Sequence, residues 1–137
     1  MRMGTQCSWG AVLVAIVTLS GCATPVPESP EVACRARAQA WLDALMAFDT
    51  EGIYGFTTPA YQSAHTVRHY SRNYAGRDMW KTAALGEISC DGAEELGVCE
   101  VELVISYRGF LMKETMTTVL KETWVQIDGA WYAQPRQ

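Results

Sequence analysis

A short apolar run near the N-terminus most limits what this chain can fold into. The run covers residues 9–19, follows the positive charge of Arg2, and ends in the small residues Ser20 and Gly21. It is shorter than the roughly 20 apolar residues that a helix needs to cross a bilayer. A positive start, a short apolar core and a small-residue end are typical of a secretory signal peptide. We therefore expect residues 1–21 to be removed and to form no part of the folded domain.

Cys22 follows this run directly. Together with Leu19, Ser20 and Gly21 it makes a stretch that resembles the lipobox of bacterial lipoproteins. In that family a diacylglycerol is attached to the cysteine thiol, and the signal peptide is cut before the cysteine. The resemblance implies a lipid anchor at Cys22, with acylation of the new amine as well, because stable attachment takes two or three acyl chains. The alternative is an ordinary secreted protein whose cysteine carries no lipid.

The residues after the cysteine predict where the anchored protein resides. Ala23 is not acidic, and among lipoproteins of Gram-negative bacteria this resembles sorting to the outer membrane more than retention in the inner membrane. Residues 22–28 include Pro25 and Pro27, and prolines favour an extended chain that does not pack. We therefore expect a short spacer and then one domain over residues 29–137, held close to the outer membrane and facing the periplasm.

The charge of the chain excludes one class of function. The 137 residues carry a formal net charge of −4, and removal of Arg2 with the signal peptide makes the charge one unit more negative. A domain that binds nucleic acid is normally basic, so we expect no nucleic-acid partner. The length that remains is enough for one domain with a single hydrophobic core.

Three cysteines follow Cys22, and an exported chain can join them in disulfides. Cys90 and Cys99 flank a polar turn between two strand-like runs, and antiparallel pairing brings the ends of such a hairpin within disulfide reach. Cys34 then remains as a small buried hydrophobe on a helix. A bridge between Cys34 and Cys90 is the competing pairing. The cysteines lack the paired spacing of a zinc site, so we expect no metal there.

A capping signal starts the first helix. Ser29 offers a capping hydroxyl, and Pro30 suits the first helical position. Apolar residues then recur at helical spacing and form one stripe. The members of this stripe are Cys34, Ala38, Trp41, Leu42, Leu45 and Phe48. Asp49 and Gly52 are expected to end this helix and to start a short second one.

Thr58 and Pro59 repeat the capping signal, and the sequence predicts a third helix over residues 59–75. Its apolar face is expected to consist of Ala60, Ala64, Val67, Tyr70 and Tyr74, and its opposite face of Tyr61, His65, Arg68, His69 and Arg72. The spacing of the two histidines fits a shared metal, but the sequence offers no third ligand, so we expect a solvated basic face. With Arg77 and Lys81 this face has the charge to meet anionic lipid headgroups or cell-wall anions, although such clusters usually only provide solubility.

The rest of the chain alternates like antiparallel strands. The expected strands cover residues 83–90, 98–107, 111–127 and 130–133. The inward side chains of the second are expected to be Cys99, Val101, Leu103, Ile105 and Tyr107. The apolar phase of the third changes between Trp124 and Val125, which predicts a β-bulge, and Asp128 and Gly129 predict a two-residue hairpin turn. Three helices followed by four antiparallel strands predict an α+β fold in which the helices pack on a curved sheet.

The order of these elements and several short stretches resemble the nuclear transport factor 2-like superfamily, whose fold is also called a cystatin-like cone. The stretches cover residues 40–45, 56–61, 122–125 and 128–132. The resemblance implies a curved sheet wrapped around the first helix, a cavity between sheet and helices, and dimers formed through the sheet. It implies no single function, because that superfamily includes enzymes, ligand binders and assembly modules.

Two functions fit such a cone. Trp41, Tyr54, Trp124 and Glu122 are the expected lining of its cavity. The preferred interpretation is an envelope lipoprotein with a non-catalytic domain, without cofactor, that binds a small apolar ligand or an envelope protein. The alternative is a small acid–base enzyme of the isomerase or dehydratase type, in which Glu122 or a tyrosine acts inside the cavity. The non-catalytic interpretation of Glu122 is an ion pair with a lysine or arginine on an open sheet face. This interpretation is favoured because an acid is seldom fully buried without a partner.

Overall fold

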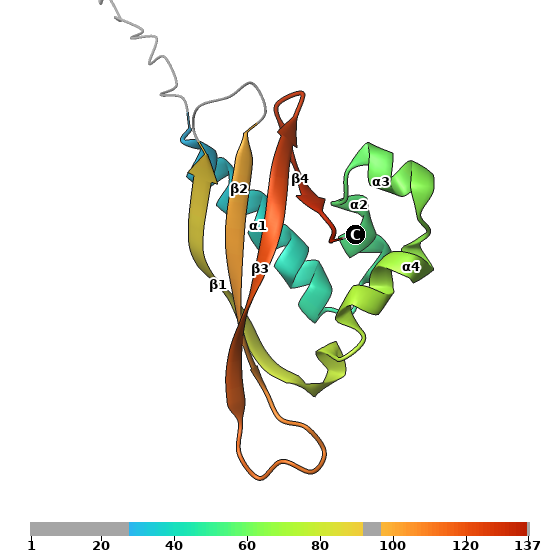
Figure 1. Cartoon of the computed structure of the whole chain (residues 1–137), viewed down its shortest axis with the longest axis vertical. Coiled ribbons are helices and arrows are strands. Elements are labelled where there is room, and N and C mark those ends of the chain that lie inside the picture. The colour runs from blue at the N-terminus through green and yellow to red at the C-terminus, as the bar shows by residue number, and fades with distance from the viewer. Residues whose placement is uncertain (1–27, 92–96, 137) are drawn as a thin grey trace, which may run out of the picture.

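The computed structural model describes residues 28–91 and 97–136 (Figure 1). The helices are α1 (Pro30–Met46), α2 (Thr50–Gly55), α3 (Pro59–Ala64) and α4 (Val67–Ser71), followed by the 3₁₀ turns η1 (Arg72–Tyr74) and η2 (Arg77–Met79). The strands are β1 (Trp80–Asp91), β2 (Val98–Tyr107), β3 (Met116–Ile127) and β4 (Ala130–Gln134). The predicted signal peptide, Cys22 and the spacer up to residue 27 lie outside the described residues. Within the described ranges no helix has both the length and the apolar character to cross a bilayer.

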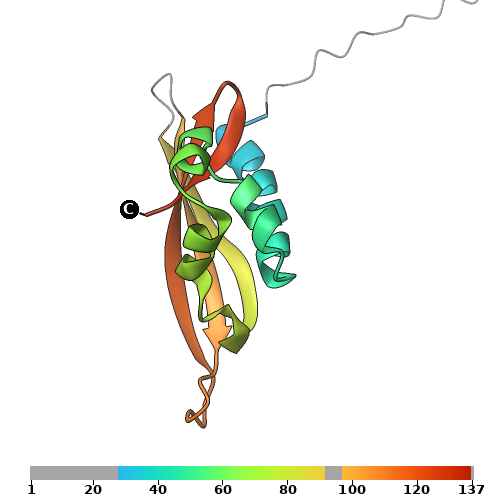
Figure 2. The same ribbon diagram turned by 90° about the vertical axis from the view of Figure 1, so that its right-hand side faces the viewer.

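The four strands form one antiparallel sheet in the order β1-β2-β3-β4. The helices lie on one side of this sheet, and the other side is open (Figure 2). Four of the five residues predicted to face inward from β2 are buried, namely Cys99, Val101, Leu103 and Ile105. An α+β fold with helices packed on a four-stranded antiparallel sheet is therefore confirmed.

Side-chain caps begin the helices where the sequence predicted. The hydroxyl of Ser29 accepts from the backbone N–H of Val32, and Asp49 and Thr58 cap α2 and α3 in the same way. Each cap satisfies a backbone N–H that has no partner inside the helix. The cap at Asp49 lies in the turn between α1 and α2, and the end of α2 then meets β4, where the N–H of Ala133 donates to the carbonyl of Phe56.

The predicted third helix over residues 59–75 is wrong in its length. It ends at Ala64, and α4 begins at Val67 after an extended residue, Thr66, whose hydroxyl accepts from the N–H of His69. The break rotates the two halves relative to each other. As a result Tyr61 is buried although it was predicted on the basic face, and Ala64 is exposed although it was predicted on the apolar face.

The predicted bulge in the third strand is also wrong. β3 pairs with β2 without a shift in register from Met116 to Val125. The irregularities lie in β1, between Trp80 and Thr82 and between Leu85 and Ile88. A bulge bends a strand and increases its twist. The bending that the sequence assigned to β3 is thus supplied by β1, against which α1 packs.

The two hairpin turns differ in length. Asp128 and Gly129 both have positive φ, as the predicted two-residue turn requires, and they join β3 to β4 directly. The turn predicted at residues 108–109 is longer, because β3 starts at Met116 and leaves residues 108–115 as a loop. This loop projects beyond the helices at the end of the molecule opposite the start of α1 (Figure 1).

Candidate ligand pocket

Glu122 lies on the helix-covered face of the sheet. Alternation along β3 places it on the same side as Leu120, and its register partner on β2 is the buried Val101. On the open side, Lys121 forms an ion pair with Glu100. The ion pair that was expected for Glu122 on the open face is therefore formed by Glu100 and Lys121, and Glu122 lies on the other face.

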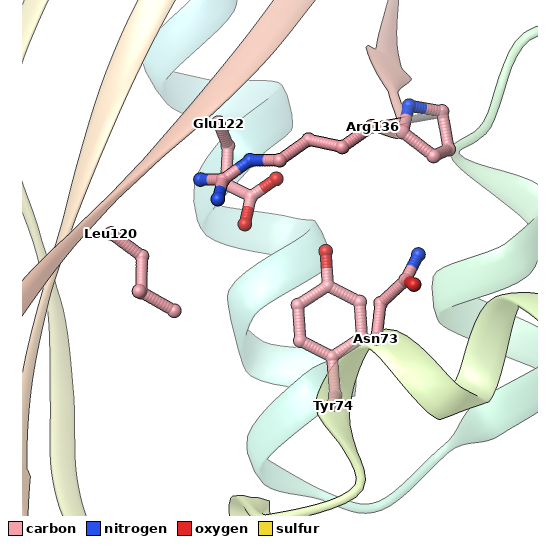
Figure 3. Close-up of a pocket in the computed structure, with 6 residues that line it drawn as sticks. Asn73, Tyr74, Leu120, Glu122 and Arg136 are labelled. Carbon is pink, nitrogen blue, oxygen red and sulfur yellow. The ribbon is translucent and has the colours of Figure 1, made fainter.

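Glu122 borders a pocket of about 240 Å³ (Figure 3). The pocket is lined by Asn73, Tyr74, Leu120, Glu122, Pro135 and Arg136. These residues come from η1, from β3 and from the segment after β4, three parts of the chain that are far apart in sequence. The pocket thus combines an amide, a phenol, a carboxyl and a guanidinium with a small apolar wall.

Burial changes the pKa of the two acids in the pocket. Desolvation raises the pKa of the Glu122 carboxyl, although the positive charge of Arg136 and the hydroxyl of Tyr74 act in the opposite direction. The pKa of Tyr74 is raised well above its usual value, first by desolvation and then by the nearby Tyr70 and Glu122. Both groups hold their protons more tightly than in water, and the phenol of Tyr74 therefore keeps the proton with which it can donate a hydrogen bond to a ligand.

Aromatic packing holds Tyr74 in position. Its ring meets the rings of Trp41 and Tyr70 edge-on, with 5.6 Å between centroids in each case. Behind it, Nε1 of Trp41 donates a hydrogen bond to the Tyr70 hydroxyl over 3.2 Å. Because edge-to-face contacts in a packed core restrict the rotation of the rings, the phenol of Tyr74 keeps its direction toward Glu122 (Figure 3).

The segment after β4 brings a cation to the pocket. β4 ends at Gln134, which pairs with Thr123, and the next residues continue alongside β3. The guanidinium of Arg136 donates a hydrogen bond to the backbone carbonyl of Lys121 and lies beside Glu122 (Figure 3). Since a guanidinium has five N–H donors, this bond leaves it able to bind an anion as well.

Of the four residues predicted to line a cavity, Glu122 alone is at this pocket. Trp41 and Trp124 are fully buried and pack against each other edge-on, with 6.1 Å between ring centroids. The hydroxyl of Tyr54 is bonded to backbone carbonyls at the end of α3. The two tryptophans fill the space between α1 and the sheet, where the resemblance implied a cavity, and Tyr54 packs among the short helices.

Sequence reasoning missed Tyr74 and Arg136. Tyr74 was assigned to an apolar helix stripe, and it does pack in the core, but its hydroxyl end reaches the pocket. Arg136 follows the last strand, where no periodicity predicts a direction for the side chain. The inward phase of Glu122 along β3, shared with Leu120, was the signal that could have located the site.

The two histidines lie close together, one at the end of α3 and one on α4. The rings of His65 and His69 stack with 4.6 Å between centroids, and Tyr61 packs on His65 at 4.4 Å. In the ranges that the structure covers, no group of three or more histidine, cysteine, aspartate or glutamate residues is arranged to hold a metal.

Arg77, which was predicted to extend the basic face, lies over the ring of Phe48, 4.8 Å from its centroid, and so stabilises the turn after α1.

Cys90 and Cys99 are directly opposite each other at the end of the β1–β2 pair, with their sulfur atoms at disulfide distance. Cys34 is buried on α1 with a free thiol. Burial raises the pKa of this thiol to about 12, which makes it unreactive. The competing pairing of Cys34 with Cys90 is not the one in the structure.

Comparison with known proteins gives little. No family model matches the chain, and no curated protein matches it in sequence. A similar solved structure is the solution structure of a SEC-C motif containing protein from Rhodopseudomonas palustris, which is 20% identical with a TM-score of 0.47, over 78% of this chain and 76% of that one. Similarity at this level assigns neither a family nor an activity, so the function has to be argued from the pocket.

Proposed function

We propose that this chain is a lipid-anchored protein of the bacterial envelope whose domain binds a small ligand in the pocket of Glu122, Tyr74 and Arg136. The binding part is supported by one observation: a desolvated carboxyl, a buried phenol and a guanidinium share one pocket. The anchoring part is supported by the apolar run and by the stretch that ends at Cys22. The order of helices and strands supports a domain of the nuclear transport factor 2-like type.

The lining of the pocket defines the chemistry of the ligand. The Arg136 guanidinium attracts a carboxylate, which it can bind through two parallel hydrogen bonds. The Glu122 carboxyl and the Asn73 amide oxygen accept from an amine, and the Tyr74 hydroxyl either donates or accepts. A volume of about 240 Å³ admits a molecule of the size of an amino acid or a short peptide. The ligand class is therefore a small zwitterion, in place of the apolar ligand expected from the aromatic residues.

A thermal-shift panel tests this ligand class. Amino acids and dipeptides are compared with their methyl esters, which lack the carboxylate, and with their N-acetyl derivatives, which lack the amine. At least one zwitterion should raise the melting temperature, and both of its blocked forms should fail to do so. Arg136→Gln should abolish the shift, and Arg68→Gln, an exposed arginine on α4, should not. A panel without any shift, or a shift that Arg136→Gln leaves intact, contradicts the proposal.

Metabolic labelling tests the lipid anchor separately. A fatty acid analogue supplied to cells that express the full chain should mark the wild-type protein and should not mark Cys22→Ala. Unlabelled wild-type protein, or equal labelling of both, refutes the anchor and leaves the ligand pocket untouched.

The acid–base enzyme is the second candidate, and the environment of Glu122 favours it. A carboxyl whose pKa is raised by desolvation, next to a phenol, is a pair of groups that can take up and release a proton. Incubation in D₂O of the zwitterion that binds best would reveal proton transfer as deuterium at the carbon next to its carboxylate. The enzyme hypothesis requires exchange with wild type and none with Glu122→Gln. Binding without exchange leaves a binding protein.

A further inference from the structure

The loop between β2 and β3 exposes two large apolar side chains almost completely. Phe110 is 93% exposed and Leu111 is 100% exposed. Backbone hydrogen bonds order this loop. The N–H of Arg108 donates to the carbonyl of Met79, and the N–H of Met112 donates to the carbonyl of Gly109. Exposing two large apolar side chains to water at the end of a structured turn costs free energy, and this cost is removed only if another surface covers them.

The surroundings of these side chains are basic, although the chain as a whole is acidic. We call residues 108–113 the hairpin tip. The tip carries Arg108 and Lys113, and Lys81 lines the same hollow as Phe110 and Arg108. This hollow shares Asp78 with a second one, which is lined by Arg72 and Arg77. The acidic residues nearest to these cations are Asp78, Glu114 and Asp49, which lies between two residues that line the second hollow, so positive charges outnumber negative ones here.

We propose that the hairpin tip inserts Phe110 and Leu111 into a bilayer that contains anionic lipid, with Arg108, Lys113 and Lys81 at the level of the headgroups. Exposed apolar residues flanked by lysine and arginine are the usual device for binding at a membrane surface. A protein partner fits less well. A stable protein interface buries about 800 Å² on each side and takes about 20–30 residues, whereas the tip is one turn of six residues that projects beyond the helices (Figure 1).

The proposal has a geometric consequence. The hairpin tip and the start of α1 lie at opposite ends of the long axis of the molecule (Figure 1). If an anchor precedes α1, both attachments reach one bilayer only when the long axis lies along the membrane surface. The domain would then lie flat, and the tip would set which side of it faces the membrane.

Vesicle flotation tests the tip without the anchor. The chain from residue 23 onward contains every described helix and strand, and it lacks the signal peptide and Cys22. It is mixed with vesicles of phosphatidylcholine alone, or of phosphatidylcholine and phosphatidylglycerol in equal parts. Wild type should float with the anionic vesicles, should float less with the neutral ones, and should be released by salt.

Substitutions in the tip identify the inserted residues. The double variant Phe110→Ser/Leu111→Ser should reduce the bound fraction about tenfold or more. Transfer of one such side chain out of water already changes a binding constant by about that factor. Its matched control, Val32→Ser/Val119→Ser, changes two exposed apolar residues away from the tip and should bind like wild type. Arg108→Glu/Lys113→Glu should abolish the preference for anionic vesicles, and Lys121→Glu on the open sheet face should not.

Two results overturn the proposal. The first is failure of wild type to float with anionic vesicles. The second is undiminished flotation of Phe110→Ser/Leu111→Ser. Because both changed side chains are in solvent, the variants should melt at the temperature of wild type, and this measurement separates a lost membrane contact from a lost fold. The outcome does not depend on the ligand pocket or on the lipid at Cys22.

Discussion

Glu122 is placed where its charge is costly. It projects from β3 into the space between sheet and helices, and desolvation raises its pKa above the usual value of 4.5. A group that holds its proton more tightly in the folded state adds stability at low pH, and the folded state loses that advantage as the pH rises through the raised pKa. The folded protein therefore carries a penalty at neutral pH that is absent at about pH 4.

Replacing this carboxylate by a neutral amide removes the penalty. We expect Glu122→Gln to raise the melting temperature at neutral pH by a few degrees, since about 1 kcal/mol corresponds to about 4–8 °C in a domain of this size. At about pH 4 the variant and wild type should melt together. Glu100→Gln, on the open sheet face beside Lys121, is the control and should bring no gain. An equal gain at both pH values would show that burial of charge is not the cause.

The sequence indicated Glu122 as a cavity residue but did not indicate the residues that surround it in this pocket, and the reason is physical. Strand alternation is local, so the inward phase of Glu122 could be derived from the residues beside it in β3. Tyr74 and Arg136 reach the same pocket only because η1 and the segment after β4 dock there. Docking depends on the whole core, and no local pattern encodes it.

At the scale of elements, the break between α3 and α4 shows how a cap overrides periodicity. The spacing of apolar residues over 59–75 fits one helix, yet Thr66 is extended and caps a new one. The hydroxyl of Tyr54 is bonded to the carbonyl of His65 over 2.6 Å, which satisfies a backbone group that the break leaves without a helical partner. Local capping and a contact from α2 thus select two short helices.

Removal of this cap should weaken the domain. We expect Thr66→Ala to cost about 1 kcal/mol, because the N–H of His69 loses its side-chain acceptor and keeps only the backbone carbonyl of residue 66. The melting temperature should fall by about 4–8 °C. Ser63→Ala, which removes an exposed hydroxyl bonded within α3, is the control and should change stability little. If Thr66→Ala is as stable as wild type, the cap does not determine the break.

The sheet was predicted better than the helices. The order of strands, the two-residue turn at Asp128 and Gly129 and the inward side of β2 all follow from alternation and turn chemistry. The location of the bulges could not be predicted in this way. A change of apolar phase in the sequence arises from a bulge, but it arises equally from apolar side chains that are half-buried on the other face of the sheet. Val125 and Ile127 are half-buried in this way.

The Cys90–Cys99 disulfide closes the β1–β2 pair, and its removal should destabilise the domain. Cys90→Ser/Cys99→Ser should lower the free energy of unfolding by about 2–3 kcal/mol, since the bridge restricts the unfolded chain. Urea denaturation measures this loss. A reductant should destabilise wild type by a similar amount and should not change the double variant. Sensitivity of the double variant to reductant would mean that another bridge contributes.

At the scale of the whole molecule, the open face of the sheet decides how two copies can meet. The resemblance implied dimers through the sheet, and that face carries Glu87, Glu100 and Glu102 around Lys121. In a two-fold contact the same patch of each copy faces its counterpart. The acidic groups of one copy would then approach those of the other, and a contact through this face would have to overcome their repulsion.

We therefore expect the domain to be monomeric at low salt, where the screening length is about 30 Å at 0.01 M. Light scattering or sedimentation velocity should show any dimer only at high salt, where like charges are screened. Val119, the exposed apolar residue among these charges, gives the diagnostic variant. If a dimer does form at low salt, Val119→Lys should leave it intact, which would place the contact away from the open sheet face. Dissociation of the dimer by Val119→Lys, but not by Val32→Lys, would instead show that the sheet faces pair despite their charge.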